Sequence, residues 1–208
     1  MAIPHQVHLT APLSGGLGMP PDPKSSVIET FPLDEATIDL ATSADAWQGV
    51  AQIFDLQVRN DVELGSTFFV NFVTTSPSVI GLKYRFGLYK ETATNEATCL
   101  AKSPLLYTNG GYYGACCVRL TADQNVSIST AYKYFIAFTM GGFNTGSITL
   151  KAKPEDYVLQ AQHITYPSNF NAESADSAWN TIRYGSWNSD YDVWFGLALD
   201  NGETEVLP

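Results

Sequence analysis

The chain has 208 residues, of which 45% are hydrophobic and 15% are charged, and its formal net charge is −10. This composition is globular and excludes a disordered chain. An acidic surface repels phosphate, so we expect no nucleic-acid partner. No run approaches the ~20 apolar residues that cross a bilayer, so we expect no membrane segment, and prolines interrupt the N-terminal residues where a secretory signal would lie.

Residues 1–33 are predicted to form an extended N-terminal arm, ahead of a single domain over residues 34–208. Five prolines lie within residues 1–23, and they forbid a regular helix and discourage a central strand. A stretch of this kind is ordered only where it lies along another surface. We therefore predict an arm that docks on a neighbouring subunit, with a disordered leader as the alternative. The apolar anchors of the arm are Ile3, Val7, Leu9, Leu13, Leu17 and Met19.

Residues 81–90 carry the clearest strand pattern in the domain. One side chain in two is apolar, which is typical of a half-buried strand. The predicted inner face holds Leu82, Tyr84, Phe86 and Leu88, and the outer face holds Lys83, Arg85, Gly87 and Tyr89. Gly87 interrupts the large residues and indicates either a bulge or a close approach by another part of the chain.

From residue 48 onward the chain has the pattern of strands separated by turns. Residues 34–47 indicate an irregular strand, and residues 172–183 a short helix capped by Asn171. Residues 91–98 are predicted to be a loop and residues 123–125 a turn between two strands. The predicted strands cover residues 48–59, 67–75, 81–90, 99–101, 105–107, 112–120, 126–130, 132–140, 147–152, 157–164 and 192–200.

Alternation assigns faces within two more of these strands. In the first, Phe54 and Leu56 are predicted to face the core, while Ile53 and Arg59 lie on a solvated face. In the last, the predicted inward residues are Val193, Phe195, Leu197 and Leu199. Strands with turns every 8–12 residues, and no long helical period, predict an all-β fold, an antiparallel β-sandwich or jelly roll.

The cysteines Cys99, Cys116 and Cys117 are too few and too irregular for a disulfide framework. Cys116 and Cys117 are adjacent, so on a strand they point to opposite faces. We expect reduced thiols, with a bridge from Cys99 to Cys116 or Cys117 as the alternative. The spacing does not match a zinc site, and we expect no metal and no cofactor.

No catalytic constellation is visible in the sequence. His163 is the histidine of the predicted domain, and no serine or acid stands at a spacing that would pair with it. The acids near the C-terminal tryptophans fit solvated loops better than a glycosidase pair. We therefore expect a protein that is not an enzyme.

Aromatic residues near these acids suggest a second function, carbohydrate binding. Sugar C–H faces stack on aromatic rings, and carboxylates accept hydrogen bonds from hydroxyl groups. The possible glycan platform consists of Trp179, Trp187, Tyr191 and Trp194. It would make the chain a carbohydrate-binding β-sandwich module that contacts a host-surface glycan.

Residues 84–90, with the sequence Tyr-Arg-Phe-Gly-Leu-Tyr-Lys, are followed by a polar loop, by residues 99–101 and by the aromatic strand over residues 134–138. This succession resembles the β-sandwich modules of tailed-phage virion structural proteins, in tail fibres, spikes and capsid decoration or cement proteins. The resemblance implies a virion component made in the host cytoplasm. It also implies other capsid or tail proteins as partners and a homo-oligomer, with a trimer as the first expectation.

Overall fold

The computed structural model describes residues 26–32, 38–43, 51–74, 83–107, 114–141, 147–154, 162–166, 172–184 and 191–200. Fourteen strands lie in this part of the chain, together with a 3₁₀ helix, η3 (Asp176–Trp179). The strands are β1 (Ile28–Glu29), β2 (Ile38–Ser43), β3 (Ala51–Asp55), β4 (Val62–Thr74), β5 (Lys83–Ala93), β6 (Glu96–Lys102), β7 (Leu106–Tyr107), β8 (Gly114–Ile128), β9 (Tyr134–Gly141), β10 (Ser147–Pro154), β11 (Gln162–Tyr166), β12 (Thr181–Tyr184), β13 (Tyr191–Val193) and β14 (Phe195–Leu199).

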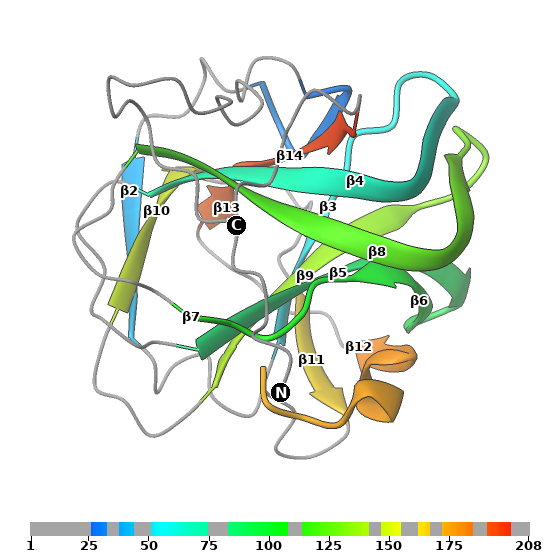
Figure 1. Ribbon diagram of the computed structural model, residues 1–208. Coiled ribbons are helices and arrows are strands. Elements are labelled where there is room, and N and C mark those ends of the chain that lie inside the picture. The colour runs from blue at the N-terminus through cyan, green and yellow to red at the C-terminus, as the bar shows by residue number, and fades with distance from the viewer. Residues whose placement is uncertain are drawn as a thin grey trace, which may run out of the picture.

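The strands form one antiparallel sheet that curls back on itself (Figure 1). Its main path runs β1-β14-β4-β8-β6-β12-β11-β3-β9-β5-β7, and β5 also pairs with β6. A single bridge between Glu29 and Gln57 joins the β1 end to the chain that follows β3. The expected all-β, antiparallel fold is therefore confirmed, while a sandwich or jelly-roll arrangement stays a prediction.

The main core lies between two walls of this curled sheet. One wall is β14–β4–β8 and the other is β3–β9–β5, and their rings meet across the interior. Phe86 of β5 lies 5.3 Å from Phe72 of β4 and 5.6 Å from Phe195 of β14, measured between ring centroids. Phe54 of β3 lies 5.1 Å from Phe195. A pleated strand sends alternate side chains to one face, and most of the inward residues predicted from alternation are buried here: Phe54, Leu56, Tyr84, Phe86, Leu88, Val193, Phe195 and Leu197. Leu82 lies outside the described residues.

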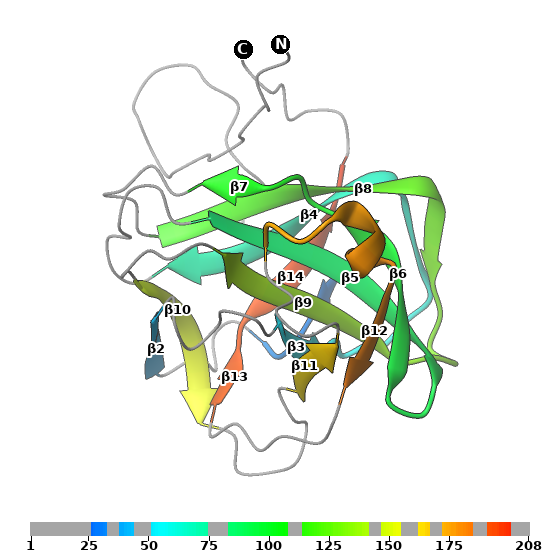
Figure 2. The same cartoon turned by 90° about the horizontal axis from the view of Figure 1, so that it is seen from below.

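A second, smaller core covers the outer face of β3, β9 and β5. Its buried residues are Ile53, Tyr89, Ala97, Phe135, Ala137, Trp179, Ile182 and Tyr184. The last three come from η3 and β12, which Figure 2 shows in front of β5 and β6. The predictions of a half-buried strand over residues 81–90 and of a solvated face at Ile53 are therefore wrong, because a distant segment covers this face.

Residues 172–183 do not form the predicted helix. Only Asp176–Trp179 adopt a 3₁₀ turn, and the chain then continues as β12, which pairs with β6. Ile182 and Tyr184 are buried while Thr181 and Arg183 are exposed, so this strand has one face on the core and the other in solvent. The proposed cap, Asn171, lies outside the described residues.

Two predicted connections also differ from the structure. Residues 91–98 form a tight hairpin between β5 and β6, in which Asn95 has a φ of 62°, and Asn tolerates that left-handed conformation. Residues 123–125 form no turn, because β8 runs through them. Between Thr67 and Gly65 of β4, the partners in β8 step from Thr121 to Val126, so the turn-forming residues make a bulge instead.

Two neighbouring strands, β1 and β14, depart from expectation. Residues 26–32, inside the predicted arm, belong to the sheet, since β1 pairs with β14 and both Ile28 and Phe31 are buried. The six predicted anchors of the arm lie outside the described residues. Leu199, predicted to face inward, is 41% exposed at the end of β14.

Candidate functional site

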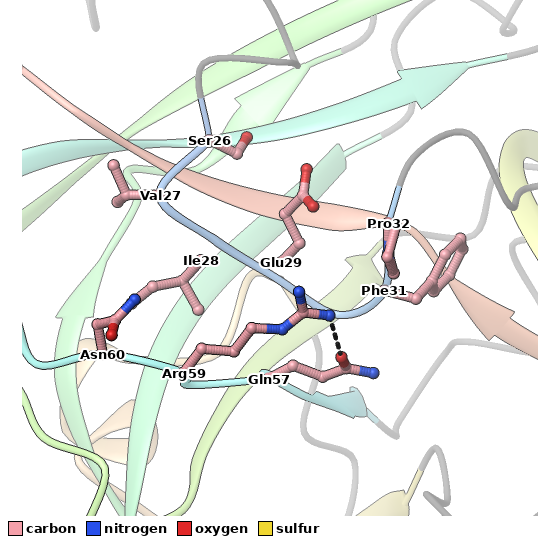
Figure 3. A pocket seen from close by; sticks show the side chains of 9 residues that line it. All are labelled: Ser26, Val27, Ile28, Glu29, Phe31, Pro32, Gln57, Arg59 and Asn60. Carbon is pink, nitrogen blue, oxygen red and sulfur yellow. Dashed lines mark hydrogen bonds between the residues drawn. The ribbon is translucent and has the colours of Figure 1, made fainter.

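A small pocket opens beside β1, where the described chain begins. Its volume is about 140 Å³, below the roughly 300–1,000 Å³ of ordinary small-molecule sites. The lining residues come from the β1 segment and from the chain after β3 (Figure 3): Ser26, Val27, Ile28, Glu29, Phe31, Pro32, Gln57, Arg59 and Asn60.

One hydrogen bond joins the two sides of this pocket, and another lies within one side. The Gln57 N–H donates to the Glu29 carbonyl at 2.8 Å, and Arg59 Nη2 donates to Gln57 Oε1 at 3.4 Å. Figure 3 shows the Arg59 guanidinium reaching toward the β1 segment. A guanidinium and a carboxylate in so small a space suit a short polar side chain or a chain terminus. The sequence analysis missed these residues, since no motif marks them.

A cluster of charges fixes residues 172–184 to the outer face of β5 and β6. Arg85 Nη2 donates to Asp176 Oδ1 at 2.6 Å, and Arg85 Nε donates to the Ser103 carbonyl at 2.8 Å. The Arg85 guanidinium carbon also lies 4.8 Å from the centre of the Trp179 ring. The hydrogen bond from Arg85, together with the charges of Arg85 and Lys102, holds the pKa of Asp176 below its usual range.

Two further cations support the same segment. The Lys83 and Glu173 side chains form an ion pair at 2.5 Å, and Lys102 donates to the Asp176 carbonyl at 3.1 Å. Glu173 accordingly raises the pKa of Lys83. Basic side chains of β5 and β6 and acids of residues 172–184 thus complement one another, which favours a structural role for this cluster.

A second polar group lies at the other end of the same segment. The Tyr184 hydroxyl donates to a Glu91 carboxylate oxygen, and the Tyr184 ring packs edge-on against Phe135 at 5.3 Å. Burial raises the pKa of Asp55 to about 6, against the opposing charge of Lys133, and raises the pKa of Tyr184 well above its usual value. The Tyr184 phenol therefore keeps its proton at neutral pH and remains the donor to Glu91.

The structure does not place the predicted glycan platform on the surface. Trp179 and Trp194 are both fully buried, so neither indole offers a face to a sugar. Trp187 lies outside the described residues, and only the backbone of Tyr191 is described. The aromatic residues are close to acids in the sequence, but the sequence does not show that the Trp179 and Trp194 rings are packed in the interior.

The three cysteines are free thiols, as expected. Cys116 faces the main core, and Cys117 faces the opposite side of β8 with Phe69 and Ala198. Burial raises the pKa of Cys99 to about 11 and that of Cys117 to about 12. Since the thiolate is the reactive form, burial suppresses the reactivity of these thiols at neutral pH.

Metal-binding and membrane-spanning features were sought in the described ranges. There, no three His, Cys, Asp or Glu side chains gather as a metal ion would require. The same ranges contain no helix long and apolar enough to cross a membrane. Comparison with protein families, with curated proteins and with solved structures found no match to this chain.

Proposed function

We propose that this chain is a non-enzymatic structural protein of a larger assembly, a phage virion component of the decoration, cement or tail-associated type. Its rigid β domain projects from the assembly, and its N-terminal arm docks on a neighbouring capsid or tail protein. A sandwich or jelly-roll arrangement of the domain, and a homotrimer, belong to this proposal.

The attachment of β1 is the observation that supports it best. The Val27 N–H donates to the Leu197 carbonyl at 2.7 Å, the Thr30 N–H to the Phe195 carbonyl at 2.9 Å, and the Thr30 hydroxyl to the Val193 carbonyl at 2.8 Å. The upstream residues therefore leave from a firmly held point on the sheet. A force on the arm is transmitted to the whole domain, as a docking tether requires.

The use of buried polar groups is consistent with this role. Arg85 and Thr30 are 6% and 1% exposed, and both hold segments of the fold together. If each of the six apolar anchors contributed about 1–2 kcal/mol on burial, the arm alone would bind tightly, and repeated copies would add avidity.

The test is deletion of residues 2–19, which removes all six anchors and leaves the residues next to β1. We expect light scattering to give a trimer for the full chain and a smaller species for the deletion, and we expect the deletion to lose binding to the virion. Serine at the exposed Leu199 is the matched control and should change neither property. Undiminished assembly and virion binding after the deletion would rule the arm out.

A further inference from the structure

The outer face of β14–β4–β8 carries a compact set of six residues, here called the outer patch. They form two rows across the three strands. Ala198, Phe69 and Arg119 are register partners, and so are Gly196, Asn71 and Cys117. Since Phe68, Val70 and Phe72 fill the main core, the alternate residues Phe69 and Asn71 point away from it.

The outer patch is covered although it faces away from the main core. Phe69 and Asn71 are 0% exposed, Cys117 is 1% exposed and Ala198 is 2% exposed. Phe69, Cys117 and Ala198 form a separate apolar cluster, and the Arg119 guanidinium lies 5.4 Å from the centre of the Phe69 ring. An outward apolar face that is this well buried needs a covering segment.

Ser26 shows from which direction that segment comes. Asn71 Nδ2 donates to Ser26 Oγ at 2.9 Å. A Cβ on Gly196 would lie 2.2 Å from the same Ser26 Oγ, so only glycine leaves room for the chain at this position. Figure 3 shows Ser26 at a crossing over the sheet, before the chain continues into β1. Ser26 therefore lies against two residues of the outer patch, Asn71 and Gly196.

The outer patch also has one acceptor and one donor without a partner. Asn71 Oδ1 and Arg119 Nε are buried and make no hydrogen bond, and each such group costs roughly 1–3 kcal/mol. Residues 20–25 read Pro-Pro-Asp-Pro-Lys-Ser. Lys24 and Ser25 have backbone N–H groups, whereas the prolines offer carbonyl groups only.

We propose that residues 20–25 of the same chain lie across the outer patch as an extended, polyproline-type segment. An N–H of Lys24 or Ser25 donates to Asn71 Oδ1, and a carbonyl of the proline stretch accepts from Arg119 Nε. Six residues at about 3.1 Å each are long enough to cross three strands spaced about 4.8 Å apart. Small side chains at Gly196, Ala198 and Cys117 let the backbone approach closely.

This arrangement does not depend on the role proposed for the arm. It gives residues 1–19 a fixed point of departure on β14–β4–β8, whatever they bind. It also makes Cys117 a reporter, because its thiol lies beneath the proposed segment.

The experiment measures labelling of Cys117 by a thiol reagent in a Cys99→Ser, Cys116→Val background. Deletion of residues 2–25 should speed labelling at least tenfold, whereas deletion of residues 2–19 should leave it unchanged. Because a truncated chain can lose its fold, the full chain with Pro20, Pro21 and Pro23 all replaced by glycine is tested in parallel. It should label faster with an unchanged tryptophan emission spectrum.

Deletion of residues 201–208 is the matched control and should not change the labelling rate. Equal protection of Cys117 in the full chain, the 2–25 deletion and the glycine variant would overturn the proposal. So would exposure of Cys117 by the C-terminal deletion alone. Protection that is lost on dilution would assign the outer patch to a neighbouring copy and would overturn it as well.

Discussion

The ring of Trp179 packs directly onto Gly87 of β5. A Cβ at Gly87 would lie 3.3 Å from Trp179 Cε3 and 2.7 Å from Tyr89 Cε2. The Tyr89 hydroxyl in turn donates to the Trp179 carbonyl at 2.7 Å. The absence of a side chain at Gly87 thus leaves the space in which the Trp179 ring packs, and Trp179 belongs to the segment that covers the second core. The pairing of β5 with β6 shifts register next to this position, between Leu88 and Tyr89.

Alanine at Gly87 should therefore destabilise the fold. The added methyl group must displace the Tyr89 or the Trp179 ring, and overpacking of this kind costs about 1–3 kcal/mol. Urea unfolding measures the change. Gly65 is the control, because its φ is 75° and no atom lies within 4 Å of an added Cβ. Asparagine tolerates that conformation, so Gly65→Asn should cost less than half as much; equal losses at the two glycines would contradict the packing argument.

The second core also shows where sequence reasoning succeeds and where it stops. Alternation predicts the inward face of β5 because that pattern is local. It cannot show that the outer face of β5 is buried, since the covering residues lie about ninety positions later in a polar segment. The alternation of Thr181, Ile182, Arg183 and Tyr184 was a usable signal for β12, and the helix prediction overlooked it.

The prediction of a turn at residues 123–125 was wrong for a related reason. Asp123, Gln124 and Asn125 have the residue types of a turn, but the length of β4 lets β8 pair on both sides of them. The bulge at Gly65 accommodates the extra residues, and long-range pairing decides between a bulge and a turn. Burial of Trp179 and Trp194 likewise depends on contacts that no local pattern contains.

Loss of the Arg85 side chain should cost more than loss of its acidic partner. Arg85→Met leaves the Ser103 carbonyl and Asp176 without their donor, and the side chain of Arg85 is only 8% exposed. A buried carbonyl left without its donor costs roughly 1–3 kcal/mol, and the contact between the guanidinium and the Trp179 ring is lost as well. Asp176 is 73% exposed, so Asp176→Asn should cost less than about 1 kcal/mol.

Urea unfolding at low and high salt separates these contributions. Glu173→Gln is the matched control, because its pair with Lys83 is partly exposed and salt screens such pairs. The small decrease in the free energy of unfolding of Glu173→Gln should disappear in high salt, whereas the decrease in Arg85→Met should persist. An Arg85→Met protein as stable as the parent would show that the charge cluster does not hold residues 172–184 in place.

Asp55 should make the protein less stable as the pH rises. Burial raises its pKa to about 6 in the folded chain, above the usual value near 4 in the unfolded chain. Folding therefore favours the protonated form of Asp55. The stability that this preference contributes is fully present below about pH 4 and is lost as the pH rises through 6. Asp55→Asn removes this dependence and should stabilise the protein at pH 7.5 by about 2 kcal/mol, with no gain at pH 4.

Asp61 supplies a control of opposite sign for this measurement. The Thr130 N–H donates to Asp61 Oδ1 at 2.7 Å, and the Thr130 hydroxyl donates to the same oxygen. These bonds lower the pKa of Asp61, so its contribution is present above pH 4 and is lost as the pH falls through the folded pKa. Asp61→Asn should then destabilise the protein at pH 7.5, and the loss should shrink as the pH falls below 4. If thermal melts from pH 3 to 8 showed the same pH dependence for both variants, desolvation of Asp55 could not be the cause.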